Sequence, residues 1–391
     1  MEISKKVDGL VLERIRELMK KKAEGKNKFI GYFPNDFMPV EIAYASGAIT
    51  LGLIEGGAHE PAEASGSYTS RFWDTFARAQ IGQWVLGNPI YRLMDLLVMP
   101  VTTRHVSNSA EMFDYFTELE TFRVPVPMAK SDFGLKYYSD GIGLFKEKLE
   151  SFSGSKISDE ELIKAINLQN NIRGLLNEIS EMRKPDPPLI SGKDFIALNH
   201  ASYLLDPGAY KQLLESVRDE LKQGAVTGQE GPRIMLVGST LARGDYKVVD
   251  MLEGFGINIV IEEFSEGLTH YQEKVEIDGD LVHALADKYF TRRLPPAWFS
   301  PPAERLEALL KIAREYRVNG IVWYQLMYQE AYDIESYYFL RRVDKELGIP
   351  TLKIESDWDP VEVGPLGTRI EAFVEILKEG THSKDILSSR K

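Results

Sequence analysis

The stretch from Leu96 to Asn108, LLVMPVTTRHVSN, decides the fold class of this chain. A hydrophobic run passes through Pro100 and opens directly onto two threonines, Arg104 and His105. A buried strand that ends in polar residues is typical of an open parallel sheet, in which ligands bind beyond the carboxyl ends of the strands. The stretch therefore predicts an α/β fold with a ligand crevice at this loop.

Similar short runs recur on both sides of this stretch and alternate with helical periods, which is the signature of parallel sheets with crossover helices. They divide equally between the two halves of the chain and predict two doubly wound domains, each with a four-stranded parallel sheet. The predicted strands are Lys28–Phe33, Ala48–Leu53, Leu96–Val101, Arg123–Pro127, Arg233–Ser239, Asn258–Phe264, Gly320–Tyr328 and Pro350–Ser356.

A helical segment separates the two halves. Ser158 and Glu161 form a capping-box signature, apolar residues then recur at helical spacing, and prolines from Pro185 onward end the run. We therefore predict an N-terminal helix over residues 1–27, a first α/β domain over 28–150, a helical connecting segment over 151–230 and a second α/β domain over 231–391.

Composition excludes several classes of protein. The net charge of −12 argues against non-specific binding to nucleic acid or anionic membranes. No run is long and apolar enough to span a membrane and no secretory signal is recognisable, so we expect a cytoplasmic protein. The absence of cysteine excludes disulfides, thiolate nucleophiles and thiolate-bound clusters in this chain. The six histidines show no HxxxH or HExxH spacing, and we expect no metal bound by this chain.

Each candidate site residue has two interpretations on pattern alone. Glu41, after the first strand, is either an acid facing a ligand or a complement to a helix dipole. His105 is either a general acid or a structural histidine. The turn at Gly238 and Ser239 either offers amides to an anion or is an ordinary strand-to-helix turn. Arg369 lies near a helix start and suits a phosphate or thioester oxygen, or binds nothing.

Several segments, taken in order, resemble the 2-hydroxyacyl-CoA dehydratase and benzoyl-CoA reductase family, and within it the 2-hydroxyglutaryl-CoA dehydratase D-component type. The resemblance covers residues from about Lys28 to Leu377. It is carried by GYFPNDFMPVEIAYASGAI, FARAQIG, LMDLLVMPVTTRH, RIMLVGSTLARGDYKVVDMLEGFGINIVIEE, ERLEALLKIAREYRVNGIVWYQLMY, GIPTLKIESDWDP and GPLGTRIEAFVEIL.

The resemblance implies two α/β domains and a pairing of homologous subunits. It also implies an ATP-dependent activator that feeds single electrons to [4Fe–4S] clusters. The implied chemistry is radical dehydration of a 2-hydroxyacyl-CoA or reduction of an aromatic CoA ester. Whether a flavin binds is left open.

This chain departs from the family at the cluster. The positions that carry cysteine in cluster-bearing relatives fall here on Asp74, Thr103 and Gln329. These residues offer oxygen or no ligand atoms, which are unsuited to an iron–sulfur cluster. The loop at Thr102–His105 thus resembles a cluster-binding loop without its thiolate.

Two functions follow from the resemblance. In the first, this chain is a cluster-free subunit that shapes an acyl-CoA pocket and holds a cysteine-bearing homologue with its [4Fe–4S] cluster. In the second, it is a cluster-free paralogue with a non-redox binding or scaffold role. The aromatic segment Tyr324–Phe339 is typical of an interface core and favours a dimer.

Any substrate site is expected between the two sheets. The resemblance matches Glu41 to a family glutamate, which we expect to contact the reacting acyl end together with Asn35, Thr103 and His105. We expect Gly238, Ser239 and Arg369 nearer to the phosphates or the thioester.

Overall fold

The protein is described by a computed structural model that covers residues 3–297 and 299–388. Two four-stranded parallel sheets form its framework, with strand orders β2-β1-β3-β4 and β6-β5-β7-β8. Their strands are β1 (Phe29–Tyr32), β2 (Ile49–Gly52), β3 (Leu96–Val101), β4 (Glu120–Pro125), β5 (Arg233–Gly238), β6 (Asn258–Glu263), β7 (Gly320–Leu326) and β8 (Thr351–Ser356). The predicted α/β class and the equal division of strands are confirmed.

The strand order reverses at the corresponding position in each sheet. The chain pairs β1 with β2 on one side and with β3 on the other, and β5 stands in the same way between β6 and β7. The loops after these central strands diverge at the reversal, which leaves a crevice for a ligand beyond their carboxyl ends. The loops after β1, β3, β5 and β7 are therefore the ones that position a site.

One predicted strand is displaced. The fourth was expected over Arg123–Pro127, whereas β4 begins at Glu120 and ends at Pro125. β4 is an edge strand with one pairing partner, β3, and Val124 is its only fully buried residue. Because a half-exposed edge strand carries polar residues, its first half shows no hydrophobic run that would mark it.

Helices cover both sheets and connect them. In the first half these are α1 (Ile3–Ala23), α2 (Val40–Ala45), α3 (His59–Ala64), η1 (Ser65–Ser67), α4 (Thr75–Val85), α5 (Pro89–Leu93), α6 (Arg104–Phe116) and α7 (Asp132–Ser153). The connecting helices are α8 (Asp159–Glu181), α9 (Gly192–Ala201) and α10 (Pro207–Lys222). The second half adds α11 (Lys247–Gly254), α12 (Leu268–Gln272), α13 (Leu281–Ala286), η2 (Asp287–Arg292), α14 (Pro302–Glu315), α15 (Glu330–Leu347), η3 (Pro360–Glu362) and α16 (Val363–Ser388).

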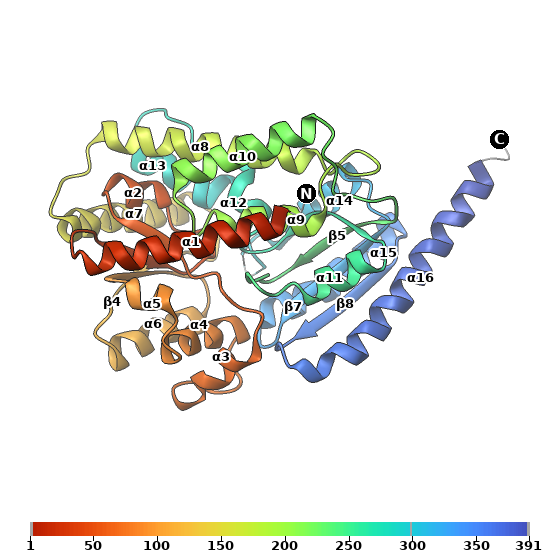
Figure 1. Cartoon of the computed structure of the whole chain (residues 1–391), viewed down its shortest axis with the longest axis horizontal. Helices are drawn as coiled ribbons and strands as arrows, with labels where there is room; N and C mark the ends of the chain where they lie inside the picture. Colours follow the sequence, from red (N-terminus) through yellow and green to blue (C-terminus); the bar gives the residue numbers. More distant parts are fainter. Residues whose placement is uncertain (1–2, 298, 389–391) are drawn as a thin grey trace.

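The predicted capping box is present at the start of α8. The Glu161 N–H donates to the Ser158 side chain and the Ser158 N–H donates to the Glu161 carboxylate, at 3.3 and 3.0 Å. In Figure 1 the two sheets lie side by side, α8 and α10 run along one side of both, α1 crosses in front, and α16 extends beyond the second sheet. None of the helices among the described residues has the length and apolar character needed to cross a membrane.

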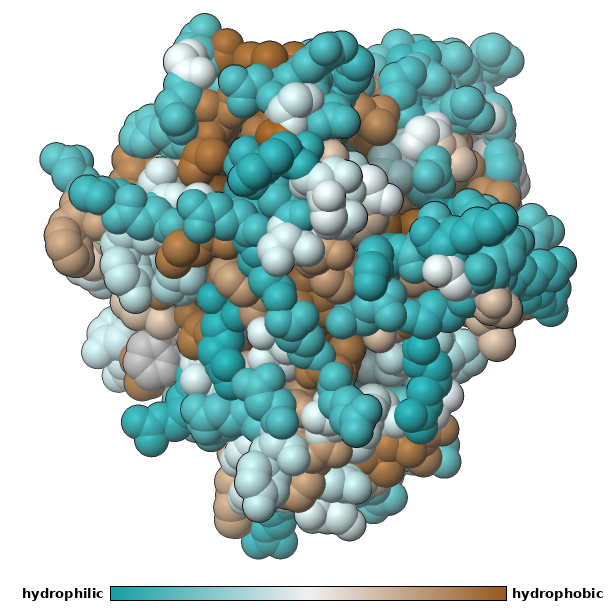
Figure 2. Space-filling view, turned by 90° about the vertical axis from the view of Figure 1, so that its left-hand side faces the viewer, coloured by the Kyte–Doolittle hydropathy of each residue, from teal (hydrophilic) through white to brown (hydrophobic). Residues whose placement is uncertain are grey.

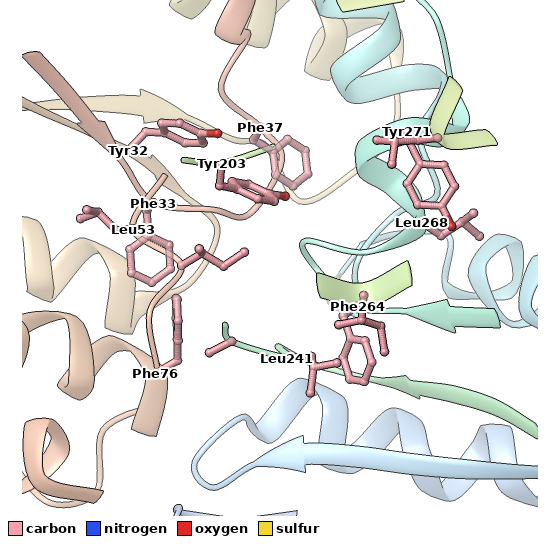
Figure 3. Packing of buried hydrophobic residues seen from close by; sticks show 14 of the residues in the cluster. Tyr32, Phe33, Phe37, Leu53, Phe76, Tyr203, Leu241, Phe264, Leu268 and Tyr271 are labelled. Carbon is pink, nitrogen blue, oxygen red and sulfur yellow. The ribbon is translucent and has the colours of Figure 1, made fainter. Parts of the chain in front are cut away.

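A single apolar core joins the two halves. Figure 3 shows Phe33, Phe37 and Phe76 from the first half facing Leu241 and Phe264 from the second. The Phe33 and Phe76 rings meet edge to face, with their centroids 5.3 Å apart. On the surface seen in Figure 2, by contrast, apolar residues form separate patches among hydrophilic ones. The space between the sheets is thus lined with aromatic rings rather than open to solvent throughout.

Candidate functional site

A small inner cavity of about 50 Å³ lies between the two halves, beyond the carboxyl ends of the central strands. Every loop singled out by the sheet topology contributes to it: the loops after β1, β3, β5 and β7. Its lining is Phe33, Pro34, Asn35, Phe37, Asp74, Phe76, Thr102, Thr103, Val106, Thr240, Ser265, Pro296, Phe299, Gln329 and Tyr332. The strand reversals thus bring residues far apart in the sequence to one site.

A larger outer cavity of about 420 Å³ adjoins the inner one and is more open to solvent. Its lining includes Arg104, His105, Met128, Tyr328 and Glu330. Both cavities share four residues, which are Asp74, Thr102, Thr103 and Gln329. These four residues form the wall between the two cavities.

The three positions that match cluster ligands in the family meet at this wall, and each stands at the start of a helix. The Asp74 carboxylate caps α4 by accepting the Ala77 N–H at 3.0 Å, and the Thr103 hydroxyl caps α6 by accepting the Val106 N–H at 3.2 Å. Gln329 precedes α15, and its amide donates to the other carboxylate oxygen of Asp74. The Asp74–Gln329 hydrogen bond joins the first half of the chain to the second.

Asp74 is a carboxyl group without an ion-pair partner among the described residues. Burial raises the pKa of Asp74 to about 6, although the Ala77 N–H and the nearby His105 counteract part of this effect. The backbone N–H of Asp74 donates to Nδ1 of His105 at 3.2 Å, so that in the neutral imidazole the proton lies on Nε2. The Trp73 ring stacks on His105 with centroids 6.3 Å apart and fixes its plane.

These side chains do not fit an iron–sulfur cluster. Such clusters are held by thiolates, whereas Asp74, Thr103 and Gln329 present a carboxylate, a hydroxyl and an amide that already bond to helix ends or to each other. These side chains therefore differ from cluster ligands in two ways: they are not thiolates, and their polar atoms are already engaged in hydrogen bonds.

Asn35 places an amide in the inner cavity. Its Nδ2 donates to the Pro100 carbonyl at 2.8 Å and to the Thr102 hydroxyl at 3.1 Å. Because a carbonyl can only accept, these bonds fix the orientation of the amide. The Oδ1 atom is buried and has no hydrogen-bond partner among the described residues.

Glu41 lies outside both cavities. It is fully buried in α2, forms an ion pair with Arg173 of α8 at 2.7 Å and accepts a hydrogen bond from the Tyr289 hydroxyl at 2.9 Å. The structure thus places this predicted catalytic residue in a contact between the first half, the connecting helices and η2. Its predicted role in catalysis stays a prediction.

A second buried charge lies beside this contact. Asp36 faces the Lys288 ammonium at 3.6 Å and Nδ1 of His270 at 3.4 Å. Burial alone would raise the pKa of Asp36, but Lys288 and His270 hold it at about 2. Burial lowers the pKa of Lys288 to about 7, and its ammonium lies 3.7 Å from the centroid of the Tyr289 ring. The sequence analysis did not identify Asp36, His270 and Lys288 as a cluster, because residues that meet only in the folded chain show no characteristic spacing in the sequence.

The remaining predicted residues lie apart from the cavities. A Cβ on Gly238 would lie 1.5 Å from the Tyr324 carbonyl oxygen, so only glycine fits where β5 runs beside β7 at this position. Ser239 is buried and accepts the Leu326 N–H at 3.2 Å. Arg369 is exposed in α16 and donates to the Lys353 carbonyl. The structure thus brings together Asn35, Thr103 and His105 around the cavities, but not Gly238, Ser239 or Arg369.

The comparisons with known proteins decide the family. The model of the family described as 2-hydroxyglutaryl-CoA dehydratase, D-component, matches residues 36–377. The chain belongs to this family. The match includes every strand of both sheets except β1, and every position at the wall between the cavities.

Several relatives match over most of their length. The protein named "Putative dehydratase subunit YjiM" of Escherichia coli (strain K12) is 28% identical, over 87% of this chain and 89% of its own. The (R)-phenyllactyl-CoA dehydratase beta subunit of Clostridium sporogenes is 24% identical, over 92% and 94%. A benzoyl-CoA reductase subunit of Thauera aromatica is 21% identical, over 78% and 79%. These relatives are named as subunits, and two of them as subunits of CoA-ester enzymes.

Proposed function

We propose that this D-component family member is a cluster-free subunit of a heteromeric CoA-ester enzyme of the 2-hydroxyacyl-CoA dehydratase or benzoyl-CoA reductase type. It shapes the acyl-CoA pocket and holds a homologous, cysteine-bearing subunit that carries the [4Fe–4S] cluster. An ATP-dependent activator donates electrons to that cluster. The reaction takes place in the cytoplasm.

One observation carries this proposal: the three family ligand positions are occupied by Asp74, Thr103 and Gln329, and Asp74 and Gln329 bond to each other. The loops that would surround a cluster are therefore held together by side chains. The inner cavity beside them persists and has the location expected for a ligand in this fold. A chain with a cavity but without thiolates depends on a partner for electron transfer.

Reconstitution with iron and sulfide tests the loss of the cluster. The unaltered chain is expected to take up no cluster, read by absorbance near ~400 nm, because it supplies no thiolate. A triple variant with Asp74→Cys, Thr103→Cys and Gln329→Cys is expected to take up one. The matched control carries three cysteines at exposed positions: Ser155→Cys, Lys164→Cys and Ser216→Cys.

Each outcome decides a separate claim. Stoichiometric cluster uptake by the unaltered chain would contradict the proposal. Equal uptake by the triple variant and the control would overturn the assignment of the three positions. For the partner, co-expression with a cysteine-bearing homologue is expected to give a complex by light scattering, and a monomer of 44.3 kDa under all conditions would contradict it.

The acid at the wall favours a second candidate function, a cluster-free paralogue with a non-redox role. Asp74, with a pKa of about 6, can hold or transfer a proton near neutral pH, and its backbone N–H donates to Nδ1 of His105. Under this alternative the chain binds its ligand without a homologous partner. If a neighbouring gene encodes a cysteine-bearing homologue and that homologue copurifies with this chain, the paralogue alternative is contradicted.

A further inference from the structure

The loop after β1, residues 33–39, belongs to the first half of the chain but is held by the second. Four of its residues line the inner cavity, namely Phe33, Pro34, Asn35 and Phe37. Figure 3 shows the Phe33 and Phe37 rings in the space between the halves. Asp36 does not line this cavity, and its carboxylate faces His270 of α12 and Lys288 of η2 instead. The same loop therefore forms one wall of the cavity and a contact between the halves.

The backbone of this loop depends on that contact. Asp36 has a φ of 54°, in the left-handed region that residues other than glycine rarely adopt. Such a conformation persists only where the surroundings hold it. The Arg293 guanidinium donates to the carbonyls of Asn35 and Asp36 at 3.2 and 2.7 Å. Because arginine stays charged, the two anchors of the loop that can titrate are Lys288 and His270.

Lys288 holds its proton weakly in this position. It is fully buried, and its Nζ has no hydrogen-bond partner in the part of the chain that the structure describes. Its contacts are the Asp36 carboxylate at 3.6 Å and the face of the Tyr289 ring at 3.7 Å. An ammonium removed from water without acceptors is unfavourable. Burial accordingly lowers the pKa of Lys288 from 10.5 to about 7, although the Asp36 carboxylate counteracts part of this effect.

His270 is in a similar position. Its Nε2 lies 3.0 Å from the Ser202 hydroxyl, which donates its own hydrogen to the Asn199 carbonyl at 2.6 Å, so that Nε2 must donate. Its Nδ1 faces an Asp36 carboxylate oxygen at 3.4 Å. The imidazolium form satisfies both contacts. Burial nevertheless lowers the pKa of His270 below its ordinary 6.5, so this proton is also held less tightly here than in water.

The surrounding groups keep their charge near neutral pH. Glu41 of α2 and Arg173 of α8 pair with each other at 2.7 Å. Burial raises the pKa of the neighbouring tyrosines above their ordinary 10; these are Tyr32, Tyr44, Tyr203, Tyr210 and Tyr289. Among the described residues around Asp36, a change of charge between about pH 6 and 9 therefore falls on Lys288 and His270.

We propose that residues 33–39 form a proton-linked gate of the inner cavity, which opens as Lys288 and then His270 leave Asp36 and take up protons. Opening exposes both bases to water, where burial no longer disfavours their charged forms. The gate goes beyond the proposed function and does not depend on which ligand the cavity holds.

The direction of the pH dependence follows from the protons that each state binds. Between about pH 7 and 10.5, the exposed Lys288 keeps a proton that the buried Lys288 has released. Each opening then takes up one proton, so opening becomes ~10-fold more frequent for every unit by which the pH falls. Below about pH 7 Lys288 is protonated in both states, and a further increase comes from His270 at pH values below 6.5.

Hydrogen exchange of the amides of residues 35–38 measures this opening in the full chain. The exchange rate is read by mass spectrometry and corrected for the intrinsic rate at each pH. The protection factor is expected to rise ~10-fold per pH unit between pH 7.5 and 9. A protection factor that does not change over this range would overturn the proposal.

Variants assign the dependence to single groups. Lys288→Met cannot titrate and is expected to lose the slope between pH 7.5 and 9. Lys130→Met is the matched control, because Lys130 donates to the Arg293 carbonyl at 2.8 Å but does not contact Asp36, and it is expected to keep the slope. If Lys288→Met does not fold, the double variant with Asp36→Asn removes both charges of the pair and is expected to lack the slope as well.

His270→Gln tests the second step. In the natural chain the protection factor is expected to fall again below pH 6.5, and the variant is expected to remove this fall. A slope above pH 7.5 that persists without Lys288, or a fall below pH 6.5 that persists without His270, would overturn the role of that residue.

Thiol labelling tests whether the loop controls access to the cavity, because the natural chain has no cysteine. Thr240→Cys places a thiol in the lining of the inner cavity. Its labelling rate is compared with that of the same thiol in the Lys288→Met background, or in the double variant, so that the titration of the thiol itself cancels. The ratio of the two rates is expected to fall ~10-fold per pH unit between pH 7.5 and 9. A constant ratio would show that the loop moves without opening the cavity and would overturn its role as a gate.

Discussion

Two contacts between the halves of this molecule solve the same problem with different chemistry. At the wall between the cavities, the Asp74 carboxyl bonds to the neutral amide of Gln329. Deeper in the molecule, Glu41 faces Arg173 and Asp36 faces Lys288. The carboxyl group is buried in both contacts, yet only the deeper contact gives each carboxylate a cation.

The two contacts differ in the protonation of their buried carboxyl groups. A cation beside a buried carboxylate holds it ionised, as at Asp36, whose pKa is about 2. At Asp74 no cation offsets burial and the pKa is raised to about 6. The carboxyl group that titrates near neutral pH is thus the one at the wall, whereas in the deeper contact the group with a pKa near neutrality is the Lys288 ammonium, at about 7.

Removal of Glu41 is expected to have the largest effect on stability. Glu41→Gln leaves the buried Arg173 guanidinium without its counter-charge, and loss of one partner of a buried pair costs about 3–5 kcal/mol. Urea unfolding measures this loss. Unchanged stability combined with lost acyl-CoA turnover in the assembled complex would instead assign Glu41 to the chemistry.

Neutralisation of Asp74 is expected to have an intermediate effect that depends on pH. Because the pKa of Asp74 is about 6 in the folded chain and about 3.9 when unfolded, the unfolded state releases its proton first, and stability falls as pH rises from about 4 to 6. Asp74→Asn retains a helix-capping side chain and removes this loss, a gain on the order of 2–3 kcal/mol above pH 6.

Urea unfolding at pH 4 and at pH 7 tests this prediction by measuring the free energy of unfolding at each pH. The variant and the unaltered chain are expected to differ less at pH 4 than at pH 7. A difference that is the same at both values would mean that Asp74 does not titrate in this range. Asp95, a partly exposed aspartate that pairs with Lys22, provides a matched control as Asp95→Asn.

Removal of one helix cap is expected to have the smallest effect. Thr103→Ala deletes the hydroxyl that accepts the Val106 N–H at the start of α6, which costs about 1 kcal/mol. Ser158→Ala at the capping box of α8, which lines neither cavity, is expected to cost a similar amount. A much larger cost at Thr103 would show that the wall contributes more than an ordinary helix end.

Most helices and strands of this protein follow from local sequence patterns. Buried parallel strands such as β5 read as continuous hydrophobic runs, and a capping box such as Ser158 with Glu161 acts within one turn, so both are visible in a linear pattern. The family positions at Asp74, Thr103 and Gln329 were likewise recognisable from the segments around them. The edge strand β4 was misplaced because its half-exposed residues carry no such run.

The contacts of those residues, by contrast, arise only when the two halves of the chain fold together. It brought Gln329 onto Asp74, left Asn35 Oδ1 without a donor and turned Glu41 away from the cavities toward Arg173. Lys288 acquired a partner in Asp36, which lies in the opposite half of the chain. Such pairings depend on how the two halves of the chain pack against each other. Burial shifts the pKa of Asp74 and of Lys288, and burial is a property of the folded chain rather than of any segment.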